Sequence, residues 1–145
     1  MNELKKLLIA VDGGPASERI AAEAFQLGKK LNAEMAVISV ADTTLLVSES
    51  GMTTAEFADS IKSSHKDNLQ ILADKIFGGF KVWLFIEEGS PADAILRVAG
   101  EWDADLVVLG THARKGLSHL LLGSVAEKVV RHSSKSLYII PINHG

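Results

Sequence analysis

The sequence contains no cysteine, only three prolines, and no run of about 18 apolar residues. The lack of cysteine excludes disulfides, thiolate metal sites and cysteine nucleophiles, and it is typical of a reducing compartment. The apolar runs are too short for a transmembrane helix. The start, MNELKKLL, lacks the apolar stretch and the small-residue cleavage site of a signal peptide. We therefore expect a cytoplasmic protein without membrane insertion.

Charge of either sign is modest, with a net value of −3. Long-range attraction to nucleic acid or to an anionic membrane is not expected from this balance. The segment 110–135 differs from the rest, because it carries five cations against the single acid Glu127: Arg114, Lys115, Lys128, Arg131 and Lys135. A cluster of this size suits a phosphorylated small molecule better than a polymer, although a solvated helix face explains the charge equally well.

Apolar residues are plentiful, and they occur in short runs that predict strands. They make up 47% of the 145 residues, enough for the core of one domain spanning 1–145. The predicted strands are 7–11, 35–41, 82–86, 106–109 and 137–140. Because apolar residues within them do not alternate with polar ones, these strands are typical of a parallel sheet covered on both faces.

Helical spacing of apolar residues separates the predicted strands. The helices are expected to begin near Pro15, near Thr53 with Glu56 as a capping box, at Ser90-Pro91, and at Ser124. The alternating order predicts a single doubly wound α/β domain with a five-stranded parallel sheet. The long irregular segment 42–52 is expected to be a flap or a partner-contacting loop.

Ligands of such sheets bind at the carboxyl ends of the strands. The residues expected there are Asp12, Ala41, Asp42, Glu87, Glu88 and the segment from Gly110 to Arg114. The last segment begins with a glycine at the end of a strand and continues as a basic loop, and Gly123-Ser124 then begins a helix. This arrangement favours phosphate binding by backbone amides and a hydroxyl. The alternative is that the glycines serve turns and Ser124 only caps its helix.

Other nucleotide signatures are missing. The chain has neither Gly-x-x-x-x-Gly-Lys-Ser/Thr nor Gly-x-Gly-x-x-Gly after the first strand. The acidic pair of a phospho-receiver domain is represented by Asp12 alone. The stretch Asp12-Gly13-Gly14-Pro15 only faintly resembles the loop of ATP pyrophosphatases, so a pyrophosphate-releasing enzyme is not favoured.

Four segments together resemble the universal stress protein family over essentially the whole chain. They are Ala10-Val11-Asp12, Ser39-Val40-Ala41-Asp42, Gly89-Ser90-Pro91-Ala92 and Gly110 to Ser124. ATP-binding members carry Gly-x2-Gly-x9-Gly-Ser/Thr, and this chain has Ala113 at the second glycine position. The resemblance implies a Rossmann-like fold similar to that of the adenine nucleotide alpha hydrolases, and a homodimer built through the last strand.

The same resemblance implies a site for ATP, with or without Mg²⁺. Asp12 is expected to bind the ribose hydroxyls, and Ala10 and Val40 to border the adenine. The phosphates are expected near Ala113, held through main-chain and hydroxyl groups of Gly110, Gly123, Ser124 and Val125. Some relatives lack the motif and bind no nucleotide.

Three histidines lie near the predicted site or on the second predicted helix. His112 and His119 flank the motif, and His112 is a candidate phosphate contact, whereas His65 is expected to pack on its helix. No carboxylate at suitable spacing supports a metal site. Trp83 and Trp102 are expected to be core or helix-packing residues.

The favoured function is an ATP-binding stress-response module that acts as a homodimer and is read by protein partners not identifiable from the sequence. One alternative is a nucleotide-free dimer that acts through protein contacts alone. Another is a slow ATPase or phosphotransferase, for which Ser118, Ser124, His112 and His119 are the nearby candidate groups. No residue set specifies catalysis.

Overall fold

The computed structural model describes residues 3–44, 54–113 and 122–143. Their five strands form one parallel sheet in the order β3-β2-β1-β4-β5. The strands are β1 (Lys6–Val11), β2 (Glu34–Asp42), β3 (Val82–Gly89), β4 (Leu106–Ala113) and β5 (Ser136–Asn143). The helices between them are α1 (Ser17–Leu31), α2 (Thr54–Phe77), α3 (Pro91–Glu101) and α4 (Ser124–His132). The predicted doubly wound α/β fold is confirmed.

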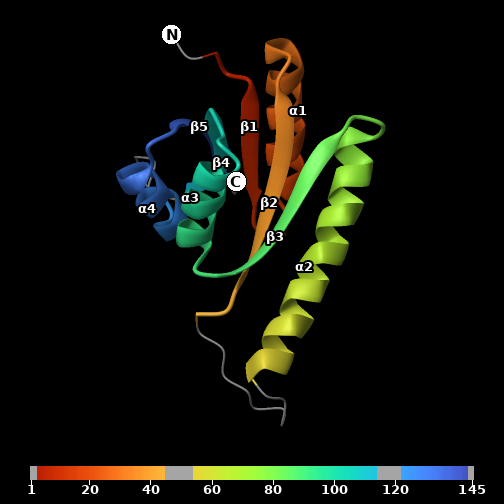
Figure 1. Cartoon of the computed structure of the whole chain (residues 1–145), viewed down its shortest axis with the longest axis vertical. Coiled ribbons are helices and arrows are strands. Elements are labelled where there is room, and N and C mark those ends of the chain that lie inside the picture. Colours follow the sequence, from red (N-terminus) through yellow and green to blue (C-terminus); the bar gives the residue numbers. More distant parts are fainter. Residues whose placement is uncertain (1–2, 45–53, 114–121, 144–145) are drawn as a thin grey trace.

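The sheet separates two apolar clusters, one on each face (Figure 1). Helices α1 and α2 cover the face that includes Leu7, Ile9 and Val37, while α3 and α4 cover the face that includes Leu8 and Ile38. Successive strand residues point to opposite faces, so an uninterrupted apolar run supplies both clusters at once. This explains why the strands are continuous in apolar character rather than alternating.

The strands run further than the sequence predicts, and β3 continues through residues 87–89. Strand β4 continues through residues 110–113, which were expected to begin the loop, and β5 continues through Pro141 to Asn143. The extensions of β4 and β5 pair with each other, from Gly110 with Ile140 to Ala113 with Asn143. Because Pro141 lies on an edge strand, its missing amide donor is tolerated inside the strand.

The helix starts follow the sequence in part. Ser90 is the N-cap of α3 and Pro91 its first residue, as predicted, although the Ser90 side chain makes no cap hydrogen bond. For α4 the N-cap is Gly123, so the interpretation of Ser124 as the cap is wrong. The proposed Thr53 capping box lies outside the described residues.

The two tryptophans differ in burial. Trp102 packs against the α3–α4 cluster, whereas Trp83 is 43% exposed on the edge strand β3, which corrects its assignment to the core.

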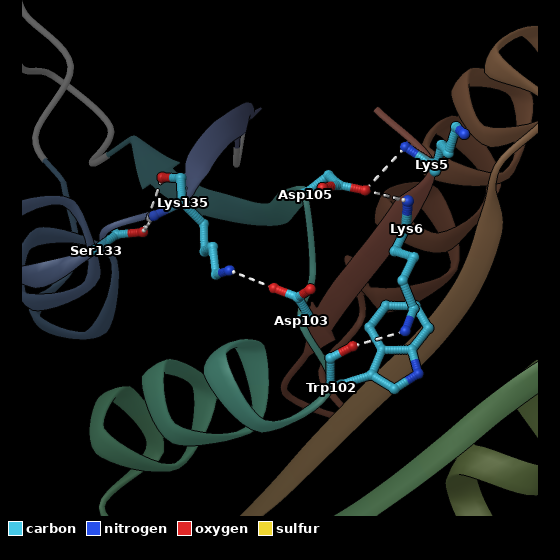
Figure 2. A network of polar contacts seen from close by, with 7 residues as sticks. All are labelled: Lys5, Lys6, Trp102, Asp103, Asp105, Ser133 and Lys135. Carbon is cyan, nitrogen blue, oxygen red and sulfur yellow. Dashed lines mark hydrogen bonds and ion pairs between the residues drawn. The ribbon is translucent and has the colours of Figure 1, made fainter. Parts of the chain in front are cut away.

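A polar network ties the strands together at the amino edge of the sheet, opposite the expected site (Figure 2). The Asp105 carboxylate accepts hydrogen bonds of 3.0 Å from the backbone amides of Lys5 and Lys6. Lys6 Nζ donates to the Trp102 carbonyl at 2.8 Å and lies 4.6 Å from the centre of the indole ring. These contacts join the start of β1 to the turn between α3 and β4.

We expect Asp105→Ala to lower the free energy of unfolding by about 1 to 3 kcal/mol, because it removes the charged acceptor of two backbone amides. Chemical denaturation followed by circular dichroism measures this change. Lys5→Ala is the matched control, because it removes an exposed ion pair with Glu3 but keeps the backbone donor, and its effect should be much smaller. Equal effects of the two substitutions would contradict the role given to Asp105.

Candidate functional site

A cavity of about 460 Å³ opens at the carboxyl ends of the strands. It lies where the strand order reverses: the chain runs outward from β1 to β2 and β3 on one side, and β4 followed by β5 lies on the other side of β1. The strands end toward the lower part of Figure 1, with α3 and α4 on one side of the sheet and α1 and α2 on the other. This is the position at which doubly wound sheets bind ligands.

Six of the eight predicted site residues line this cavity: Ala10, Asp12, Val40, Gly110, Gly123 and Val125. Ser124 does not line it and stands as the first residue of α4, beside Gly123. Ala113 is the last residue of β4, and its side chain lies outside the described part of the structure. The fold therefore brings segments that are far apart in the sequence to one site.

Asp12 follows β1 and is held in a tight turn. Its Oδ1 accepts a hydrogen bond of 2.8 Å from the Gly14 amide and one of 3.3 Å from the Ser17 hydroxyl. The Ser17 Oγ in turn accepts the Gly13 amide at 3.1 Å, and Gly13 has a φ of +81°, which favours glycine. The turn thus orients the carboxylate at the mouth of the cavity and begins α1.

Gly110 creates space inside the fold. A Cβ atom at this position would lie 2.5 Å from Cδ1 of Ile20 on α1 and 3.2 Å from Cγ1 of Ile142 on β5. Ile20 and Ile142 are both buried. A side chain at this position would displace the Ile20 side chain, so glycine favours the close packing of α1 against β4.

The wall formed by α4 and β4 offers hydrogen-bond donors. The Gly123 N-cap supplies no side-chain acceptor to the first amides of α4. Thr111, on β4, is 1% exposed, and its Oγ1 has no hydrogen-bond partner within the described part of the chain. A buried hydroxyl without a partner is costly, so the Thr111 hydroxyl has hydrogen-bonding capacity to offer to a ligand or to an ordered water. Such donors suit phosphate oxygens.

The described residues of the basic cluster, which was expected to attract phosphate, do not line the cavity. Lys128 pairs with Asp93 at 2.8 Å, Arg131 with Glu127 at 2.9 Å, and Lys135 with Asp103 at 3.0 Å. These pairs lie on the surface, so the interpretation as a solvated helix face holds for them. Arg114 and Lys115 lie outside the described residues, as do Ser118 and His119.

The acidic residues at the ends of β2 and β3 differ in whether they line the cavity. Asp42, the last residue of β2, lines the cavity, and hydrogen bonds from the Thr44 hydroxyl and backbone amide hold its pKa below the ordinary 3.8. Glu87 near the end of β3 forms an ion pair with Arg97 of α3 instead of joining the cavity. The segment 45–52, expected to be a flap, lies outside the described residues.

The family model that matches this chain is that of the universal stress protein family, over residues 3–141. The chain belongs to this family. It is 31% identical over 144 residues to the universal stress protein MJ0531 of Methanocaldococcus jannaschii, covering 96% of this chain and 83% of the relative. It is 30% identical to YxiE of Bacillus subtilis, covering 93% of this chain and 97% of the relative.

Solved structures of universal stress proteins share the fold. UspA from Lactobacillus plantarum matches with a TM-score of 0.79 at 20% identity, covering 97% of this chain and 99% of that one. A universal stress protein solved in complex with cAMP matches with a TM-score of 0.61 at 24% identity, covering 97% and 98%. These likenesses establish the doubly wound topology.

Alanine replaces the glycine of the universal stress protein motif at position 113 without straining the backbone. Ala113 lies in β4, paired with Asn143, and the only non-glycine residues with positive φ in the described ranges are Asn32 and Asp103. The cost of about 1 to 2 kcal/mol that alanine pays in a left-handed conformation therefore does not arise. The added methyl group is the remaining difference from glycine.

Helix α2 contributes two residues to the cavity that were not predicted as site residues, Ile61 and His65. His65 Nδ1 lies 2.8 Å from the hydroxyl of Ser39, a 3% exposed residue of β2. His65 was expected to pack on its helix, and its partial burial agrees with that, but its position at the cavity is new. The spacing of Ile61 and His65 by one helical turn was the signal available in the sequence.

The described residues offer neither a metal site nor a membrane-spanning helix. No group of three or more histidine, aspartate or glutamate side chains in 3–44, 54–113 and 122–143 is arranged to hold a metal ion. Within the same ranges, no helix combines the length and the apolar character needed to cross a membrane.

Proposed function

We propose that this universal stress protein binds ATP in the cavity at the carboxyl edge of the sheet and acts as a homodimeric regulatory module in the cytoplasm. The observation that carries the proposal is that one cavity is lined by six of the eight residues that the family resemblance assigns to the base, the ribose and the phosphates. Ala10 and Val40 offer an apolar wall, Asp12 a carboxylate, and Gly123 with Val125 the start of α4.

The chemistry of this cavity fits a nucleotide. Its apolar wall suits a purine, and a carboxylate accepts hydrogen bonds from ribose hydroxyls. The Thr111 hydroxyl, which has no hydrogen-bond partner among the described residues, and the N-terminal amides of α4 suit phosphate oxygens. ATP would bring any Mg²⁺ on its phosphates.

The proposal is tested by calorimetric titration of the full chain with ATP in the presence of magnesium at fixed ionic strength. Saturable binding with one site per chain is expected. Mass spectrometry of the purified protein provides an independent measurement, since tightly held nucleotide is retained through purification. If neither method detects ATP, the chain is better described as a nucleotide-free module that acts through protein contacts.

Ala113→Gly should bind ATP more tightly than the wild type, by up to about tenfold, equivalent to 1.4 kcal/mol. The reason is steric: the substitution removes a methyl group at the motif position where the backbone is expected to pass close to the phosphates. The strand conformation of Ala113 makes a larger gain from relieved strain unexpected. Parallel titrations of the two proteins measure the difference, and a glycine variant that binds more weakly would contradict this explanation.

The dimer is proposed to form through the outer edge of β5. This strand lies at the end of the sheet, and its Tyr138 is 38% exposed. An apolar edge strand presents unpaired backbone groups that favour pairing with another chain. A two-fold axis would let β5 of two copies pair with each other.

A further inference from the structure

His65 stands between two cavities. The cavity of about 460 Å³ is lined by His65 together with Asp12 and the apolar residues Ala10 and Val40. A second cavity of about 400 Å³ opens between α1 and α2, and its lining also includes Asp12 and His65 but neither Ala10 nor Val40. Asp12 and His65 therefore line both cavities, whereas the proposed adenine contacts Ala10 and Val40 line only the first.

The imidazole of His65 is anchored from the sheet. Ser39 is buried in β2, and its Oγ lies 2.8 Å from His65 Nδ1. A serine hydroxyl can donate or accept, so either tautomer of the ring is compatible with this bond. The bond fixes the ring through one nitrogen and leaves Nε2 as the nitrogen that does not contact Ser39.

We propose that His65 contacts a ribose hydroxyl of the bound nucleotide through Nε2, beside Asp12, and makes the site selective for ribonucleotides over deoxyribonucleotides. Ser39 acts as the positioning residue for this contact. The inference rests on the proposed nucleotide-binding function and extends it to the sugar. The position of His65 supports the sugar rather than the base, because it shares both cavities with the proposed ribose ligand Asp12.

Two substitutions separate the nitrogens of the ring. In His65→Asn the amide occupies the place of Nδ1, so the contact with Ser39 is retained and the Nε2 contact is lost. In His65→Gln the amide reaches the place of Nε2. We expect His65→Asn to weaken ATP by about three- to tenfold, the equivalent of one hydrogen bond, and His65→Gln to weaken it less.

The decisive measurement is a set of calorimetric titrations with ATP, 2′-deoxy-ATP and 3′-deoxy-ATP. The wild type should bind ATP more tightly than at least one deoxynucleotide, and His65→Asn should reduce that preference. His132→Asn, the same change at the exposed end of α4, is the control and should leave all three affinities unchanged. Equal losses of ATP and both deoxynucleotides in His65→Asn would overturn the assignment to the ribose.

Ser39→Ala tests the positioning role. A purely structural role would lower the melting temperature and leave the preference for ATP over the deoxynucleotides intact, whereas a positioning role lowers that preference as well. If the wild type binds no ATP, the proposed function fails and this inference fails with it. If the wild type binds ATP and the His65 variants keep its affinities for all three nucleotides, only this inference is overturned.

Discussion

Asp12→Ala is expected to weaken ATP binding by about 10- to 150-fold, because it removes the charged acceptor proposed for the ribose hydroxyls. The carboxylate lines the cavity and is oriented by hydrogen bonds from Gly14 and Ser17. Calorimetric titration of wild type and variant with ATP at the same magnesium concentration measures the loss. Equal affinities would place the nucleotide in another site.

The same substitution also loosens the turn that begins α1, and a matched variant separates this effect from the loss of the ligand contact. Ser17→Ala removes the Ser17 hydroxyl bonds to Asp12 and to the Gly13 amide but keeps the carboxylate. We expect Ser17→Ala to weaken ATP much less than Asp12→Ala. If the two variants lose the same affinity, order in the turn rather than contact with the carboxylate governs binding.

The fold was predictable because its signal is local. Runs such as 7–11 and 35–41 supply both faces of the sheet, so burial can be recognised from the sequence without knowing the neighbours of a strand. The extension of β4 over residues 110–113 carries no such signal. It exists because residues 140–143 of β5 pair with it, and such long-range pairing is not visible in a single segment.

The candidate site was predictable in part for the same reason. Asp12 and Gly123 follow from the positions of strand ends and a helix start, supported by the family resemblance. The pairing of His65 with Ser39 depends on how α2 lies against β2, across 26 residues of chain, and this cannot be read from periodicity. The burial of the Thr111 hydroxyl, without a partner in the part of the chain that the structure describes, is likewise recognised only when its surroundings are known.

Ile139→Asp is expected to convert the proposed dimer to a monomer, because it places a charge at the centre of the outer strand β5, where two copies would meet. Analytical ultracentrifugation and light scattering measure the mass. Ile139 also packs against the α3–α4 cluster, so the variant must be shown by circular dichroism and thermal unfolding to remain folded.

Trp83→Asp is the matched control for this experiment, because it introduces the same charge at an exposed apolar residue on β3, the opposite edge of the sheet. A folded monomer for Ile139→Asp and a dimer for Trp83→Asp would locate the interface at β5. The reverse result would locate it at β3. Each edge strand has its own set of unpaired backbone groups, so a charge on one edge does not block pairing through the other. Loss of the dimer in only one variant therefore identifies the edge that forms the interface, even where both substitutions reduce stability.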